Sequence, residues 1–161
     1  MLGSVAFSVS NDGDTGSEST GQNFIQALVP KLIITGIHVD FDFGTYPGTG
    51  SIEQDRDINI AMNYVGTYSV IATGDGIGGA FTITDGTQVI PYSVFFNDQT
   101  GTSGRFELLS GVPVTALTGG VTPLSNSTPN ANTSVLVGEA DIQSADAGVY
   151  EGHVIITVSP E

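Results

Sequence analysis

The chain of 161 residues has no cysteine and no tryptophan, and its only basic residues are Lys31, Arg56 and Arg105. Without cysteine it has neither a disulfide framework nor a thiolate metal site. Seventeen acidic residues give a formal charge of −14. Such a charge opposes binding to phosphate backbones and to anionic lipid. We therefore expect no nucleic-acid partner.

Long apolar runs and catalytic signatures are also missing. The apolar residues 1–10 lack a basic region and are too short to span a membrane, so we expect no membrane insertion; a signal-peptide remnant is the alternative interpretation. The two histidines, His38 and His153, lie far apart in the sequence, and no serine carries the signature of a nucleophile. We therefore expect no enzyme, no catalytic residue and no cofactor.

The residues that are abundant favour strands and tight turns. There are 22 glycines, and the apolar content is concentrated in valine, isoleucine and phenylalanine, whereas good helix formers are scarce. We expect almost no helix and an antiparallel β-sandwich of Greek-key type, because no helical crossovers are present to build a parallel sheet. Residues 32–161 would form this domain, preceded by an extension, residues 1–31, with a Gly/Ser/Asp-rich linker at 11–22.

Alternation of apolar and polar residues predicts the individual strands. The clearest is Leu32 to Phe43, which places Ile33, Phe41 and Phe43 on one face. Gly74 to Gly79 is predicted to be a hairpin turn, and Leu117 to Asn132 a long polar loop. Further strands are predicted at 57–63, 67–73, 80–84, 88–97, 105–110 and 133–140, each bounded by Gly, Asp, Asn or Pro.

The last predicted strand runs from about Tyr150 to Ser159. Its alternation places Tyr150, Val154, Ile156 and Val158 on one face and polar residues on the other, with Ile155 as an exception. If this strand closes the fold, its second edge has no partner, and the unpaired amides and carbonyls of an apolar edge recruit another chain. We therefore expect this edge to be an interaction site.

Several polar groups are candidate ligand or modification sites. His38, Asp40 and Asp42 share one strand face, and residues 11–18 carry oxygen ligands in a spacing somewhat like that of a calcium loop. We interpret the first as a solvated face and the second as a flexible linker, and we expect no metal. Asn126 and Asn132 stand in glycosylation sequons, which only a glycosylating host would modify.

Three motifs resemble those of one superfamily. Residues 39–46, Val-Asp-Phe-Asp-Phe-Gly-Thr-Tyr, are similar to an element near the first strand of spore coat protein U-like pilins. Residues 68–76 followed by 89–98 resemble the central region of these pilins, and residues 147–158 resemble the ending of chaperone/usher pilins in general. Residues 146–150, Asp-Ala-Gly-Val-Tyr, also resemble the tyrosine corner of immunoglobulin domains, although Gly152 stands where those domains have cysteine.

The pilin resemblance implies an incomplete immunoglobulin-like sandwich that lacks its seventh strand and polymerises by donor-strand complementation. The implied function is that of a structural subunit of an extracellular pilus or fimbria, exported through the periplasm, for adhesion or biofilm formation. The implied partners are other copies of the chain, a periplasmic chaperone and an outer-membrane usher. The disulfide that many of these pilins carry is absent here.

Two segments are candidates for the donor strand. The first is Phe24 to Val29, with Ile25, Ala27 and Val29 on one face; the second is residues 3–9, with Val5, Phe7 and Val9 on one face. The acceptor edge would be the closing strand, with Tyr150, Val154, Ile156 and Val158 on its core face. The alternative function is a self-contained adhesive or ligand-binding sandwich, such as a tip adhesin, a coat protein or a calcium-stabilised surface domain.

Overall fold

The computed structural model of the chain describes residues 25–36 and 40–161. The chain divides into two units, residues 1–30 and residues 31–161, and each is described by itself. The described elements are, in order, β1 (Ile33–Gly36), β2 (Ile52–Met62), β3 (Tyr68–Gly74), the 3₁₀ turn η1 (Ile77–Gly79), β4 (Thr82–Thr84), β5 (Val89–Pro91), β6 (Ser93–Asn97), β7 (Phe106–Leu108), β8 (Val114–Leu117), β9 (Ala131–Val137), α1 (Glu139–Gln143) and β10 (Val154–Pro160).

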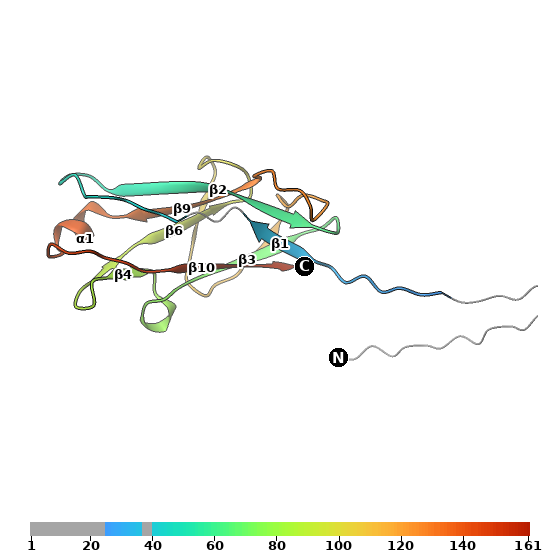
Figure 1. Cartoon of the computed structure of the whole chain (residues 1–161), viewed down its shortest axis with the longest axis horizontal. Helices are drawn as coiled ribbons and strands as arrows, with labels where there is room; N and C mark the ends of the chain where they lie inside the picture. The colour runs from blue at the N-terminus through green and yellow to red at the C-terminus, as the bar shows by residue number, and fades with distance from the viewer. Residues whose placement is uncertain (1–24, 37–39) are drawn as a thin grey trace, which may run out of the picture. The chain divides into compact units, whose positions relative to one another are not determined.

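The strands of residues 31–161 form a five-stranded sheet in the order β1-β2-β9-β6-β7, a three-stranded sheet in the order β10-β3-β8, and the two-stranded sheet β4-β5. Every pair of neighbouring strands in these sheets is antiparallel. Figure 1 shows β2, β9 and β6 in one layer and β3 with β10 in the other. The predicted fold class, an all-β antiparallel sandwich, is confirmed.

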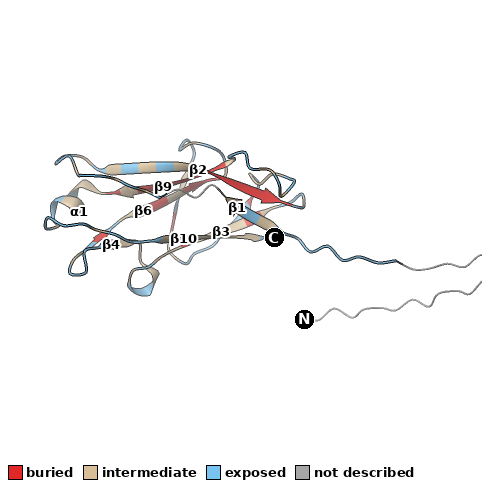
Figure 2. Ribbon diagram, in the orientation of Figure 1, coloured by how far each residue is buried: buried red, intermediate tan, exposed pale blue. Residues whose placement is uncertain are grey.

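The core lies between the two layers. Alternate side chains of β2, β3 and β6 point into it, as expected for strands with one buried face. Its fully buried members include Ile60 of β2, Val70 of β3 and Phe96 of β6, and the rings of Phe96 and Phe106 pack with centroids 5.9 Å apart. Figure 2 shows this burial concentrated in the second half of β2 and in β9 and β6.

The two halves of β2 differ both in burial and in their strand partners. Residues Asn59–Met62 pair with β1 on one edge and are buried, whereas residues Ile52–Ile58 pair with β9 only. Between Ile52 and Asp57 the side chains alternate between half-buried and exposed. One side of the sandwich is therefore open along the first half of β2.

Several strand predictions need correction. The predicted strand from Leu32 to Phe43 is reduced to β1, and residues 40–43 are not a strand, while 37–39 lie outside the described residues. The predicted strand from Gln88 to Asn97 is broken at Tyr92, because β5 pairs with β4 while β6 joins the five-stranded sheet. The Gly74–Gly79 segment is not a hairpin turn, since β3 and β4 belong to different sheets.

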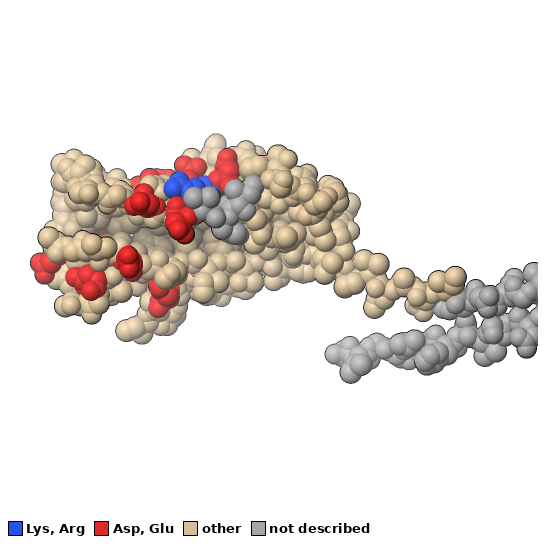
Figure 3. Space-filling view, viewed as in Figure 1, with Lys and Arg blue, Asp and Glu red and all other residues tan. Residues whose placement is uncertain are grey.

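The connections also differ from the expectation. The stretch between β7 and β9 contains the short strand β8, which pairs with β3, and α1 follows β9 directly. Within the described residues no helix is long and apolar enough to cross a membrane. On the face drawn in Figure 3, acidic side chains surround the few basic atoms, as the formal charge of −14 leads one to expect.

Candidate functional site

The closing strand β10 lies at an edge of its sheet. It pairs with β3 along its whole length, from Val154 opposite Gly74 to Pro160 opposite Tyr68. No strand of the described residues pairs with its second edge. The groups on that edge are consequently available for a further strand.

The side chains of β10 alternate as the sequence predicts. Val154, Ile156 and Val158 are half-buried and pack against the core, while Thr157 is exposed and Ile155 is 58% exposed. A strand with a fully covered inner face would bury such residues completely. The inner face of β10 is therefore only partly covered.

Tyr150 precedes β10 rather than belonging to it, which corrects the predicted start of the strand. Its hydroxyl donates a hydrogen bond to the carbonyl oxygen of Asp146 at 3.0 Å, across four residues of the turn. Burial, together with nearby Asp85 and Asp146, raises the pKa of the phenol. Gly152 lies so close to β4 that a Cβ would stand 2.6 Å from the carbonyl oxygen of Thr82. Tyr150 thus anchors the turn, and Gly152 lets the chain approach β4.

The start of β10 is tied to its surroundings by the backbone and side chain of His153. Its carbonyl oxygen accepts hydrogen bonds from the amide of Asp75 at 3.3 Å and from the hydroxyl of Tyr92 at 3.0 Å. Nδ1 of His153 lies 2.9 Å from a carboxylate oxygen of Asp75, and this contact lowers the pKa of Asp75. Burial, with a smaller effect of Asp75, raises the pKa of Tyr92 to about 12. These contacts hold the beginning of β10 in place.

The opposite wall of the open side is the first half of β2. The segment 40–43 runs past it without forming a ladder, and side chains make the connection instead. The guanidinium of Arg56 donates to the carbonyl oxygen of Asp40 at 3.1 Å and lies 5.5 Å from the ring of Phe41. The amide of Gln54 donates to the carbonyl oxygen of Asp42. The backbone edge of β2 facing this segment is therefore not paired with a strand between Ile52 and Ile58.

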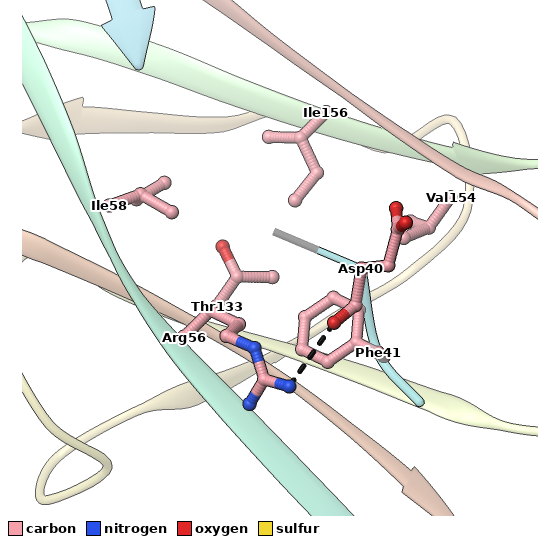
Figure 4. Close-up of a pocket in the computed structure, with 7 residues that line it drawn as sticks. All are labelled: Asp40, Phe41, Arg56, Ile58, Thr133, Val154 and Ile156. Carbon is pink, nitrogen blue, oxygen red and sulfur yellow. Dashed lines mark hydrogen bonds between the residues drawn. The ribbon is translucent and has the colours of Figure 1, made fainter. Parts of the chain in front are cut away.

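Two cavities lie between these walls. The smaller has a volume of about 150 Å³ and reaches from β2 and β9 to β10. Figure 4 shows its lining, with Phe41 between the two walls: Asp40, Phe41, Arg56, Ile58, Thr133, Val154 and Ile156. The larger, of about 1040 Å³, extends beyond the start of β10 and is lined in part by Ile83, Ile90, Tyr92, Val135 and Val137. The open side is thus a groove lined by apolar side chains together with carboxylates such as Asp40, Asp42 and Glu151.

The predicted donor residues are only partly described. Phe24 of the first segment and Val5, Phe7 and Val9 of the second lie outside the described residues. In the first segment Ala27 is exposed, and Ile25, Leu28 and Val29 are 90%, 90% and 74% exposed. Residues 25–29 therefore present apolar side chains without a core to bury them.

The other candidate sites can be placed as follows. His38 and residues 11–18 lie outside the described residues, and among those described no group of three or more His, Cys, Asp or Glu side chains could hold a metal ion. Asn132 is fully buried, and its amide donates to carboxylate oxygens of Asp55 and Asp57 at 3.0 and 2.8 Å. In the folded chain the side chain of Asn132 is therefore not accessible for glycosylation. Asn126, in the first sequon, is half-buried in a loop.

Comparisons with known proteins identify the class of fold. No protein-family model and no curated protein matches the sequence. A chain from the chaperone–tip adhesin complex of CFA/I fimbriae biogenesis is 14% identical, with a TM-score of 0.53 over 80% of this chain. A chain from the CsuC–CsuE chaperone–tip adhesion subunit complex of Csu pili of Acinetobacter baumannii is 16% identical, with a TM-score of 0.49 over 81% of this chain.

This chain spans 42% of the length of the first of these proteins and 40% of the second. At this level of identity the likeness concerns the fold. The fold is a β-sandwich similar to that of a chain in the chaperone–tip adhesin complex of CFA/I fimbriae biogenesis. The all-β sandwich implied by the sequence motifs is thereby confirmed.

Proposed function

We propose that the chain is a structural subunit of an extracellular pilus or fimbria. In this proposal an apolar N-terminal segment of one copy enters the groove of the next copy and completes an immunoglobulin-like sandwich by donor-strand complementation. The observation that carries the proposal is the free edge of β10 beside a groove whose inner side chains are only half-buried. A strand added there would pair the edge amides and cover the apolar side chains in one step.

The chain also provides a segment of the required chemistry. Residues 25–29 are rich in exposed apolar side chains, and a β-strand added to a sheet gains affinity from main-chain hydrogen bonds and specificity from alternate side chains. A second copy is therefore the occupant that we propose for the groove. The similarity to a chain from the chaperone–tip adhesin complex of CFA/I fimbriae biogenesis supports a role in a pilus.

The remaining parts of the proposal follow from this role. A periplasmic chaperone would protect the groove before assembly, and an outer-membrane usher would export the subunit to the cell surface. Adhesion or biofilm formation would be the task of the filament, and we propose no catalytic activity. Because each groove would receive a segment of the same chain, the filament would be a homopolymer.

Electron microscopy of the purified chain tests the proposal. We expect rods of repeated subunits from the full chain and none after deletion of residues 1–30. In the full chain, Ile156→Asp places a charge on the inner face of β10 and is expected to prevent assembly, whereas Thr157→Asp on the exposed face is the matched control. Normal filaments from the deleted chain would refute the proposal.

Size-exclusion chromatography distinguishes a filament subunit from the main alternative, a self-contained sandwich. A self-contained sandwich, including a tip adhesin that does not polymerise, would run as a stable monomer at every concentration. A filament subunit shifts to larger species as its concentration rises. A monomer over the whole range would favour the adhesive alternative.

A further inference from the structure

We propose that Thr133 selects the donor strand and its register, by receiving the side chain of Gln26 from a neighbouring copy. The inference rests on the proposed function above and deepens it. It assigns Gln26 and Leu28 to the inner face of the donor, in place of Ile25, Ala27 and Val29.

The inner face of the groove is not uniformly apolar. Thr133 of β9 stands opposite Arg56 of β2 in the ladder, and both side chains line the cavity of about 150 Å³. Along β9 the residues of the same face are otherwise apolar, namely Ala131, Val135 and Val137. The cavity therefore combines an apolar wall with a small hydrogen-bonding patch.

Of the facing pair Arg56 and Thr133, the hydroxyl of Thr133 is the group that lacks a hydrogen-bond partner. Arg56 already donates to the carbonyl oxygens of Asp55 and Asp40 and to the side-chain oxygen of Gln54. Thr133 is 2% exposed, and its hydroxyl oxygen is buried without a hydrogen-bond partner. Figure 4 shows that oxygen directed to the space between Ile58 and Ile156, where an added strand would place a side chain.

The unpaired hydroxyl limits the kind of side chain that belongs in the cavity. A buried polar group without a partner is destabilising, so an apolar occupant would leave this penalty in place. An uncharged amide can both donate to and accept from a hydroxyl, and its burial does not require a counter-ion. The cavity therefore favours a Gln or Asn side chain between two apolar neighbours on the donor.

The candidate donor segments differ in this respect. Gln26 is followed two residues later by Leu28 and preceded two residues earlier by Phe24, so one strand face carries an amide between large apolar residues. No polar residue lies on the opposite face of that segment, which carries Ile25, Ala27 and Val29. The same is true of the face of residues 3–9 that carries its Val and Phe side chains. The pattern selects the first segment and reverses its predicted inner face.

A double-mutant cycle tests the pairing. The acceptor is the full chain with Ile25→Asp and Leu28→Asp, changes that prevent its own segment from filling a groove through either face. Two labelled peptides are used, residues 22–31 with and without Gln26→Leu. The dissociation constant of each peptide is measured for this acceptor and for the acceptor that also carries Thr133→Val. We expect the Gln-to-Leu ratio to change roughly three- to tenfold when the hydroxyl is removed, as for one neutral hydrogen bond. Thr157→Val, an identical change on the exposed face, should leave the ratio unchanged.

A second pair of peptides tests the face directly. Leu28→Asn is expected to abolish binding because it puts an amide against the apolar wall, whereas Ala27→Asn is expected to bind normally. A ratio that does not respond to Thr133→Val, or the reverse pattern with the two Asn peptides, overturns the inference while leaving donor-strand complementation intact. Absence of binding by the unmodified peptide, and by a peptide of residues 2–10, would instead refute the proposed function.

Discussion

Replacement of Tyr68 by phenylalanine is expected to stabilise the protein. Tyr68 begins β3, opposite Pro160 at the end of β10, and is fully buried. Its hydroxyl oxygen is buried without a hydrogen-bond partner. Removing that oxygen relieves an unpaired polar group and keeps the ring that fills the core.

The magnitude follows from the cost of such a group. An unsatisfied buried hydroxyl costs about 1–3 kcal/mol, so Tyr68→Phe should raise the free energy of unfolding by about 1 kcal/mol or more. For a domain of this size that corresponds to a rise in Tm of roughly 2–4 °C. Tyr64→Phe is the matched control: the hydroxyl of Tyr64 donates to the carbonyl oxygen of Thr67 at 2.9 Å, and its loss should cost about 1 kcal/mol.

The stability gained by Tyr68→Phe is also expected to depend on pH. Burial raises the pKa of Tyr68 well above the ordinary value of 10.0, so the folded chain keeps this phenol protonated where the unfolded chain ionises. The unfolded state then binds fewer protons, and stability falls as the pH rises above 10. Tyr68→Phe removes this contribution, so its advantage over the unmodified chain should grow between pH 9 and pH 11.

Urea unfolding followed by circular dichroism, with Tm measured in parallel, provides the assay. Equal slopes against denaturant are required before the midpoints are compared. If Tyr68→Phe destabilises the chain as much as Tyr64→Phe does, the hydroxyl of Tyr68 has a partner in the folded protein. Such a result would contradict the expectation that this hydroxyl is buried without a partner.

Two further predictions concern the outer face of the five-stranded sheet. Glu53 pairs with Arg105, whose hydrogen bond lowers the pKa of that carboxyl below 4.5; the stabilisation is therefore present above that pH and is lost as the pH falls through the lowered pKa. Glu53→Gln should cost about 0.5 kcal/mol at pH 7 and less at pH 2, measured by denaturant unfolding at both values; an equal cost at both would contradict the ion-pair explanation. Asn132→Asp places a third carboxyl beside Asp55 and Asp57 and should cost about 3 kcal/mol at neutral pH, whereas Asn126→Asp keeps an acceptor for the amide of Thr128 and should stay within about 0.5 kcal/mol. Similar thermal shifts for the two variants would show that the buried amide does not stabilise the fold as described.

Local alternation was sufficient to predict much of the sandwich. The inner face of β10 and the existence of β3 and β6 follow from a period of two, because a half-buried strand must alternate, whereas β9 has buried residues on both faces. The motif at residues 146–150 also predicted that Tyr150 anchors this turn. The ends of the strands are harder to predict from the sequence, because the pairing partner of a strand decides where its ladder stops. Thus the strand predicted through Phe43 stops at Gly36, and the one predicted from Gln88 is divided at Tyr92.

The sequence by itself determined the all-β class, the apolar face of the closing strand and the surplus of apolar residues near the N-terminus, because composition and period are local properties. Only the tertiary structure decided that the first half of β2 and the second edge of β10 stand without strand partners on one open side. It also decided that Thr133, one more polar residue in a strand-forming stretch, has a buried hydroxyl without a partner. Whether a polar atom is paired depends on residues that are distant in sequence, and alternation carries no information about them.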